Sequence, residues 1–217
     1  MNYIKITALL FLFLFMSCKQ AAHKKTHIHE AEVVKSVSDS VIIDCNYTLT
    51  EALQGTKAPD SVTEELELIT VKYLSMDGKV HQGQLLTNKQ ISKDLQEVFD
   101  YMLSISFPVE RVVPIVKYNW NDDLSMKDNN TYSFCYRNVS FSKHARGMAV
   151  DINPFLNPLR WRADYSYRKD KPEGATYNPD VPGTFYPENP VVLKFKEKGF
   201  RWGRTFKRNN DDHHFEK

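Results

Sequence analysis

Two polar stretches of the sequence combine imidazole and carboxylate groups at spacings suited to binding a metal ion. In FSKHARGMAVDINP, residues 141–154, His144 and Asp151 stand seven positions apart. The second stretch, NNDDHHFEK at residues 209–217, contains Asp211, Asp212, His213, His214 and Glu216. Zinc accepts imidazole and carboxylate ligands, and a catalytic zinc site has three of them and an open position for water. The two stretches together therefore predict a zinc site.

The strand expected in GMAVDINP sets the direction of the Asp151 side chain. Strand side chains alternate between two faces, so Val150 and Ile152 point to a buried face and Asp151 points away from it. Gly147 permits a turn that brings His144 back over the strand. These two residues would supply two of the three ligands.

The C-terminal stretch offers several candidates for the third ligand. If Phe215 points into the core, His213 points with it, and His214 lies on the opposite face with Glu216. This favours His214 as the ligand. The same alternation would place Asp212 rather than Asp211 beside His214, and it leaves Glu216 open between a place next to the ligands and plain surface.

The surrounding elements indicate an α+β domain with a small, mainly antiparallel sheet and flanking helices. Alternating residues around Asp77-Gly78 predict a hairpin, and residues 87–106 have helical spacing after a capping residue, Thr87 or Asn88. RVVPIVKY, residues 111–118, reads as a strand, NWNDDLSMKDNNT at 119–131 as a surface loop, and residues 189–199 as a short helix closed by Gly199.

The N-terminus predicts export and membrane attachment. Residues 1–18 have one lysine, an apolar run and a cysteine, as in a lipoprotein signal peptide with Cys18 as the lipidated residue. A plain cleaved signal with an incidental Cys18 is the alternative. Residues 19–40 are polar and read as a flexible tether, whose histidines are more simply explained by a solvated linker than by metal capture. The remaining residues, 41–217, form the predicted domain.

The net charge and the cysteines limit which partners and covalent links we expect. The net charge of +2 gives no reason to expect a nucleic-acid partner, and we expect a monomer held to the membrane only by its anchor. In an exported protein facing the periplasm, Cys45 and Cys135 are permitted to form a disulfide, but the sequence does not show whether they approach each other.

The segment SFCYRNVSFSKHARGMAVDINPFLNP, together with the C-terminal GFRWGRTFKRNNDDHHFEK, resembles the zinc D-alanyl-D-alanine carboxypeptidase family. That family includes VanY-like and L-alanyl-D-glutamate peptidases and shares its fold with the hedgehog signalling domain. Its pattern S-x-H-x-x-G-x-A-x-D followed by D-x-x-H is met by Ser142, His144, Gly147, Ala149 and Asp151, and by Asp211 and His214. The likeness is expected to extend over most of residues 64–217.

The resemblance implies a role for each matching residue. His144, Asp151 and His214 would hold Zn²⁺, Asp211 would be the general base, and Arg137 would bind the substrate carboxylate or the developing oxyanion. The choice of Asp211 over Asp212 rests on the family spacing, and it requires a loop rather than a strand at that point. Cys135 departs from the asparagine that the family often has there.

The favoured function is hydrolysis of a peptide bond in the peptidoglycan stem peptide by a zinc-dependent D-alanyl-D-alanine carboxypeptidase. An endopeptidase of the same family, cutting between L-Ala and D-Glu, is the alternative within enzymes. Outside enzymes the alternatives are a zinc-containing module that binds the cell wall without catalysis and a lipoprotein whose C-terminal cluster is incidental. Retention of Asp211 beside three ligands favours catalysis, because a binding domain has no use for a positioned base.

Overall fold

The computed structural model describes residues 41–217, which belong to a compact unit spanning Ser40–Lys217. The predicted signal peptide, the lipidation of Cys18 and the tether at 19–40 lie outside the described residues. Within residues 41–217, none of the helices combines the length and apolar character that crossing a membrane requires.

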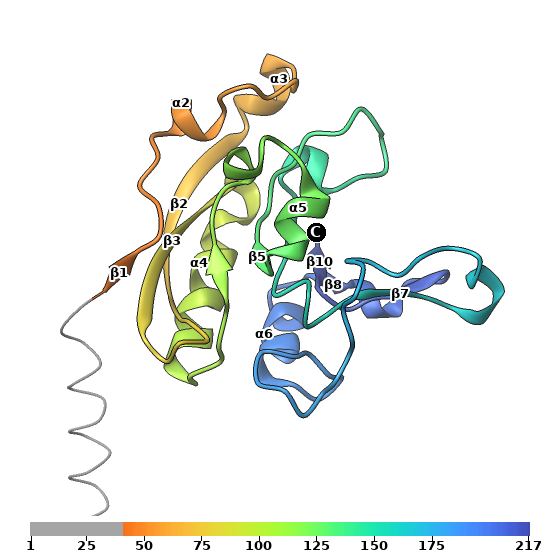
Figure 1. Cartoon of the computed structure of the whole chain (residues 1–217). Coiled ribbons are helices and arrows are strands. Elements are labelled where there is room, and N and C mark those ends of the chain that lie inside the picture. Colours follow the sequence, from red (N-terminus) through yellow and green to blue (C-terminus); the bar gives the residue numbers. More distant parts are fainter. Residues whose placement is uncertain (1–40) are drawn as a thin grey trace, which may run out of the picture. The chain divides into compact units, whose positions relative to one another are not determined.

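The first part of the domain is a long hairpin with a helix against it (Figure 1). Strands β2 (Leu66–Leu74) and β3 (Val80–Asn88) pair antiparallel, and β1 (Ile42–Ile43) joins β3 in parallel. Gly78 adopts a φ of +79° in the turn between β2 and β3, which a glycine accepts without steric cost. The hairpin predicted around Asp77-Gly78 is confirmed.

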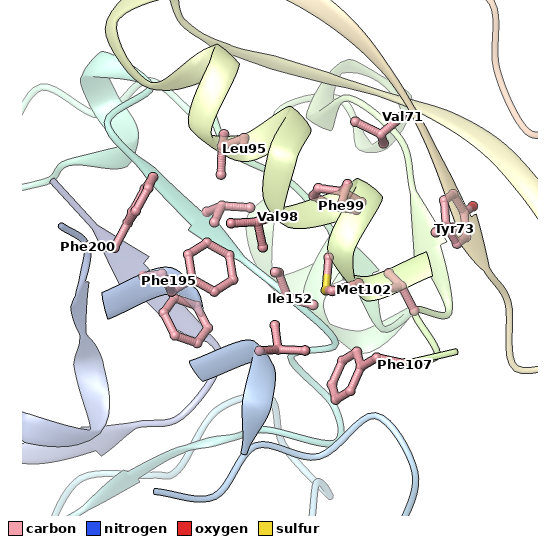
Figure 2. Close-up of a cluster of buried hydrophobic side chains, with 14 of the residues drawn as sticks. Val71, Tyr73, Leu95, Val98, Phe99, Met102, Phe107, Ile152, Phe195 and Phe200 are labelled. Carbon is pink, nitrogen blue, oxygen red and sulfur yellow. The ribbon is translucent and has the colours of Figure 1, made fainter. Parts of the chain in front are cut away.

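Helix α4 (Lys89–Ser104) follows β3 directly, as its periodicity predicts. The Asn88 side chain caps it by accepting a hydrogen bond from the backbone N–H of Gln90 at 2.9 Å. Its apolar face carries the main core together with residues from the C-terminal half (Figure 2). The buried residues of that face are Ile91, Leu95, Val98, Phe99 and Met102.

The middle of the chain differs from the sequence-based prediction. In RVVPIVKY only β4 (Arg111–Val112) is a strand, since Pro114 lacks an N–H to continue it and a 3-10 helix covers Ile115–Tyr118. The predicted surface loop contains α5 (Asp122–Lys127), which Asn121 caps by accepting from the N–H of Leu124 at 3.1 Å. The loop prediction was therefore wrong for this stretch, which ends in β5 (Asn130–Thr131), a parallel partner of β4.

The C-terminal half contains the small sheet that matters for the site. Strand β10 (His214–Glu216) lies between β6 (Ala149–Asp151) and β8 (Arg201–Trp202), antiparallel to both. Strands β7 (Leu159–Trp161) and β9 (Asn209–Asp211) form a separate antiparallel pair.

Helix α6 packs its apolar side against this sheet. It spans Pro190–Glu197, and Gly199 follows it with a φ of +81°, as expected of a residue that closes a helix. Phe195 of α6 stacks on Phe215 of β10 with their ring centroids 4.0 Å apart, so Phe215 points into the core as predicted.

The remaining helices are short. They are α2 (Leu49–Ala52), α3 (Asp60–Thr63) and 3-10 helices at His144–Arg146, Ala163–Tyr165 and Gly203–Thr205. The domain is thus α+β, with mostly antiparallel pairing in small sheets. Cys45 and Cys135 are free thiols.

Candidate metal centre

Three ligand atoms from distant parts of the sequence meet at one point. His144 Nε2 lies 3.0 Å from Asp151 Oδ1 and 3.0 Å from His214 Nδ1, and the last two atoms are 2.9 Å apart. All three side chains are buried. The structure therefore brings together the three residues predicted to hold a metal, in an arrangement that could bind one.

Backbone geometry fixes where each of these side chains starts. Asp151 ends β6 and His214 begins β10, and the two residues are direct partners across the antiparallel pair. His144 opens a 3-10 helix that Gly147 terminates with a φ of +66°. A Cβ atom at Gly147 would lie 2.8 Å from the backbone nitrogen of Asn88, so the turn requires glycine for close approach as well as for conformation.

The outer nitrogens of both imidazoles are held by acceptors. His144 Nδ1 lies 2.6 Å from the carbonyl oxygen of Ser133, and His214 Nε2 lies 3.0 Å from Glu216 Oε2. A carbonyl or carboxylate oxygen can only accept a hydrogen bond, so His144 Nδ1 and His214 Nε2 carry the protons. The lone pairs of His144 Nε2 and His214 Nδ1 therefore face the centre. Glu216, whose place the sequence left open, is thus a neighbour of the ligand set.

The electrostatics favour a cation at the centre. Burial opposes ionisation of Asp151, but the neighbouring His144 and His213 outweigh it and hold its pKa well below the usual value. Burial also lowers the pKa of His214, yet hydrogen bonds to Asp151 and Glu216 raise it to about 10. The site therefore attracts positive charge, which a proton supplies or a metal ion could replace.

The two adjacent aspartates lie in different environments. Asp211 ends β9, and the next two residues form a turn before β10, so strand alternation does not run from Asp211 to His214. Asp212 is fully buried between Arg160 at 2.6 Å and Arg204 at 3.0 Å. Asp211 instead lines the cavity that contains the three ligands. The loop that the family spacing requires is present.

This cavity has a volume of about 630 Å³ and also receives Arg137. The guanidinium of Arg137 donates to Asp122 Oδ2 at 2.5 Å and to the hydroxyl of Tyr132 at 3.3 Å. The partner Asp122 lies in the stretch that the sequence presented as a loop, which is why the ion pair was not predicted. Arg137 thus shares the cavity with the ligands, held by an acid from α5.

Residues 137–217 match the family model described as D-alanyl-D-alanine carboxypeptidase. The match is confined to this C-terminal segment. No curated protein and no solved structure matches the chain. The resemblance is confirmed over the matched segment, which contains Arg137, both ligand stretches and Asp211. The matched segment begins at residue 137, so the likeness expected over residues 64–136 stays a prediction.

Within the matched segment, the predicted orientation of His213 was wrong. It does not point into the core with Phe215, because the turn before β10 rotates it toward Asp211. Its Nδ1 donates to the carbonyl oxygen of Asn157 at 2.7 Å, and its Nε2 lies 2.9 Å from Asp211 Oδ1 without the alignment of a hydrogen bond. Burial lowers the pKa of His213, but Asp211 and Asp151 raise it to about 9.

Proposed function

We propose that this protein is a zinc-dependent peptidase that hydrolyses a peptide bond in the peptidoglycan stem peptide, as a D-alanyl-D-alanine carboxypeptidase. One observation carries the proposal: three converging ligand atoms and the carboxylate of Asp211 line a single cavity within a segment that matches a peptidase family. A binding module would need the ligands but not the additional carboxylate.

The ligand set fits zinc. Two imidazole nitrogens and one carboxylate oxygen are the donors of many catalytic zinc sites, and the hydrogen bonds to Ser133 and Glu216 set their lone pairs toward the centre. Bound zinc would supply Lewis acidity, lowering the pKa of water and polarising a carbonyl group.

The other residues of the cavity would handle protons and developing charge. Asp211 Oδ1 is buried and lies 2.9 Å from His213 Nε2, and its carboxylate would accept a proton and later deliver it to the leaving amine. Arg137, oriented by Asp122 and Tyr132, would stabilise negative charge on the substrate oxygen.

The cleaved bond decides between two activities of the same site. A carboxypeptidase acts at the end of the stem peptide and is sensitive to amidation of the terminal carboxylate, whereas an L-Ala-D-Glu endopeptidase is not. Incubation of defined muropeptides with the purified protein, followed by mass spectrometry, identifies the cleaved bond. We expect loss of the terminal D-alanine, a slower reaction after amidation of its carboxylate and no reaction after addition of a chelator. An intact stem peptide under all conditions would refute the peptidase proposal.

The proposed membrane location rests on the N-terminal sequence alone. A lipid anchor on Cys18 would hold the domain to a membrane on the periplasmic side, and the tether would let a monomer reach the stem peptides of the wall. Intact-mass analysis of protein extracted from membranes should show a lipid adduct that Cys18→Ala removes. An unmodified mass for the membrane-extracted protein would contradict the anchor.

A further inference from the structure

Four cationic side chains line the metal cavity, and two of them already have acidic partners. They are Arg137, Lys143, Lys171 and Arg208. Arg137 is paired with Asp122 at 2.5 Å and Lys171 with Asp123 at 2.7 Å. Within residues 41–217, Lys143 and Arg208 have no carboxylate within ion-pairing distance. Carboxylates of Asp151, Asp211 and Glu216 also line the cavity, so Lys143 and Arg208 mark local rather than overall positive charge.

Arg208 is the better placed of these two cations. Its backbone carbonyl accepts a hydrogen bond from the N–H of Arg162 at 3.1 Å, which ties the residue to the end of β7. Its side chain is exposed, and its guanidinium carbon lies 5.9 Å from the ring centre of Tyr165, at the outer limit of a cation–π contact. Lys143 lies instead on the loop shared with a second cavity and has a longer, more flexible stem.

One face of the β7–β9 pair forms the wall next to Arg208. Asn209 is paired with Trp161 and Asp211 with Leu159, and all four residues line the cavity. The intervening Asn210 does not line it, as alternation requires. Asn209 thus stands on the same face as Asp211, two residues along the strand, which is roughly 7 Å.

The side chain of Asn209 is also available for a ligand. It is 9% exposed, and within residues 41–217 its amide makes no hydrogen bond. An amide offers both a donor and an acceptor, which matches the two polar groups of a peptide bond. A guanidinium next to it offers the paired donors that a carboxylate accepts.

We infer that Arg208 and Asn209 form a subsite for a carboxylate of the substrate peptide that lies one or two residues from the cleaved bond. The spacing supports this assignment, since a peptide residue spans at most about 3.6 Å and the subsite begins two strand residues from Asp211. The inference rests on the proposed function and adds a determinant of specificity to it. In this assignment Arg137 stabilises negative charge on the reacting oxygen, and Arg208 binds the substrate carboxylate.

The test uses two stem-type peptides that differ only in whether the carboxylate beside the cleaved bond is free or amidated. We expect amidation to raise KM by about tenfold in the wild-type protein, because a charge-assisted bidentate contact is lost. In Arg208→Gln the two peptides should have equal KM values with kcat little changed, and Arg208→Lys should restore part of the preference. Lys207→Gln is the matched control, since Lys207 is an exposed neighbour outside the cavity lining.

Binding of a ketomethylene analogue, which cannot be hydrolysed, separates this inference from the proposed function. If the protein binds the free acid more tightly than the amide and Arg208→Gln removes that difference, the subsite stands even without peptidase activity. A preference that persists in Arg208→Gln, or that Lys143→Gln removes instead, would overturn the assignment. So would equal binding of both analogues by the wild-type protein.

Discussion

His214 and Asp151 face each other across the β10–β6 pair, with Nδ1 and Oδ1 2.9 Å apart. Backbone pairing therefore sets the distance between two of the proposed ligands, and the 3-10 turn ended by Gly147 adds the third. A one-residue slip of β10 would turn His214 away and direct Phe215 into the site. The register of β10 against β6 therefore determines whether His214 and Asp151 meet at the proposed metal centre.

Replacement of a single proposed ligand should abolish zinc binding. His144→Ala and His214→Ala each leave two donors where a stable site needs three, so both variants should lose zinc and activity. Elemental analysis of the purified proteins gives the metal content, and circular dichroism checks that they are folded. A folded His144→Ala protein that keeps a full equivalent of zinc would show that the metal lies elsewhere.

The two neighbouring aspartates should respond differently to substitution. Asp211→Asn should keep most of the zinc and lose about 100-fold or more in kcat, because the base is removed and the ligands are not. Asp212→Asn should lower the free energy of unfolding by about 1–3 kcal/mol, since Arg160 and Arg204 lose their buried charged partner. Steady-state kinetics and urea unfolding measure the two effects. An Asp212→Asn protein that is stable but inactive would reverse the assignment.

Glu216 should tune the affinity for zinc through His214. Glu216→Ala removes the acceptor at His214 Nε2 and should weaken zinc binding by about 10- to 100-fold, whereas Glu216→Gln keeps an acceptor and should lose less. Competition with a chromophoric chelator measures both affinities. Arg201→Ala is the control, because Arg201 contacts Glu216 from an exposed position. Equal affinities for the Ala variant and the wild type would rule out this role.

Two glycines with similar backbone angles allow a matched test of the turn at the site. Gly147→Ala combines a positive φ with contacts of 2.8 Å to Asn88 and Leu66, whereas Gly78→Ala has a positive φ in open space. We expect losses of about 3 kcal/mol and about 1 kcal/mol respectively in the free energy of unfolding. Denaturant unfolding of both variants provides the comparison. Similar losses would mean that the neighbours of Gly147 move aside.

Both thiols should react slowly in the folded protein. Burial raises the pKa of Cys45 and of Cys135 to about 11, so at pH 8 each is almost entirely protonated, and the thiolate needed for alkylation is scarce. In the unfolded chain the pKa returns to about 8.5 and alkylation becomes fast. Mass spectrometry after iodoacetamide treatment, with and without denaturant, measures the difference. Failure to alkylate the unfolded, unreduced protein would indicate a disulfide.

Local patterns predicted the elements that follow simple periodicity. The Asp77-Gly78 hairpin and helix α4 formed as expected because turn chemistry and an apolar face act over a few residues. Helix α5 was missed because its polar sequence has no apolar periodicity, and its formation depends on the cap at Asn121. The short sheets of the C-terminal half are held by tertiary packing, which a strand of two or three residues does not reveal.

The candidate metal centre, like the fold, was predicted only in part. Its three ligands followed from residue type and the family pattern, but the pattern alone could not place the side chains around them. Strand alternation failed at Asp211 and His213 because a turn separates β9 from β10. The partners of Arg137 and Arg208, or the lack of them, depend on α5 and on the β7–β9 pair, which only the folded chain brings to the cavity.

Phe215 separates His214 from Glu216 in β10 and stacks on Phe195 in the core. The residues on either side of this aromatic ring cannot leave their positions while the ring stays packed. A bound ion could leave through the cavity, but displacement of the strand that carries His214 should require the core to open. The metal centre and the core would then unfold as a single cooperative unit.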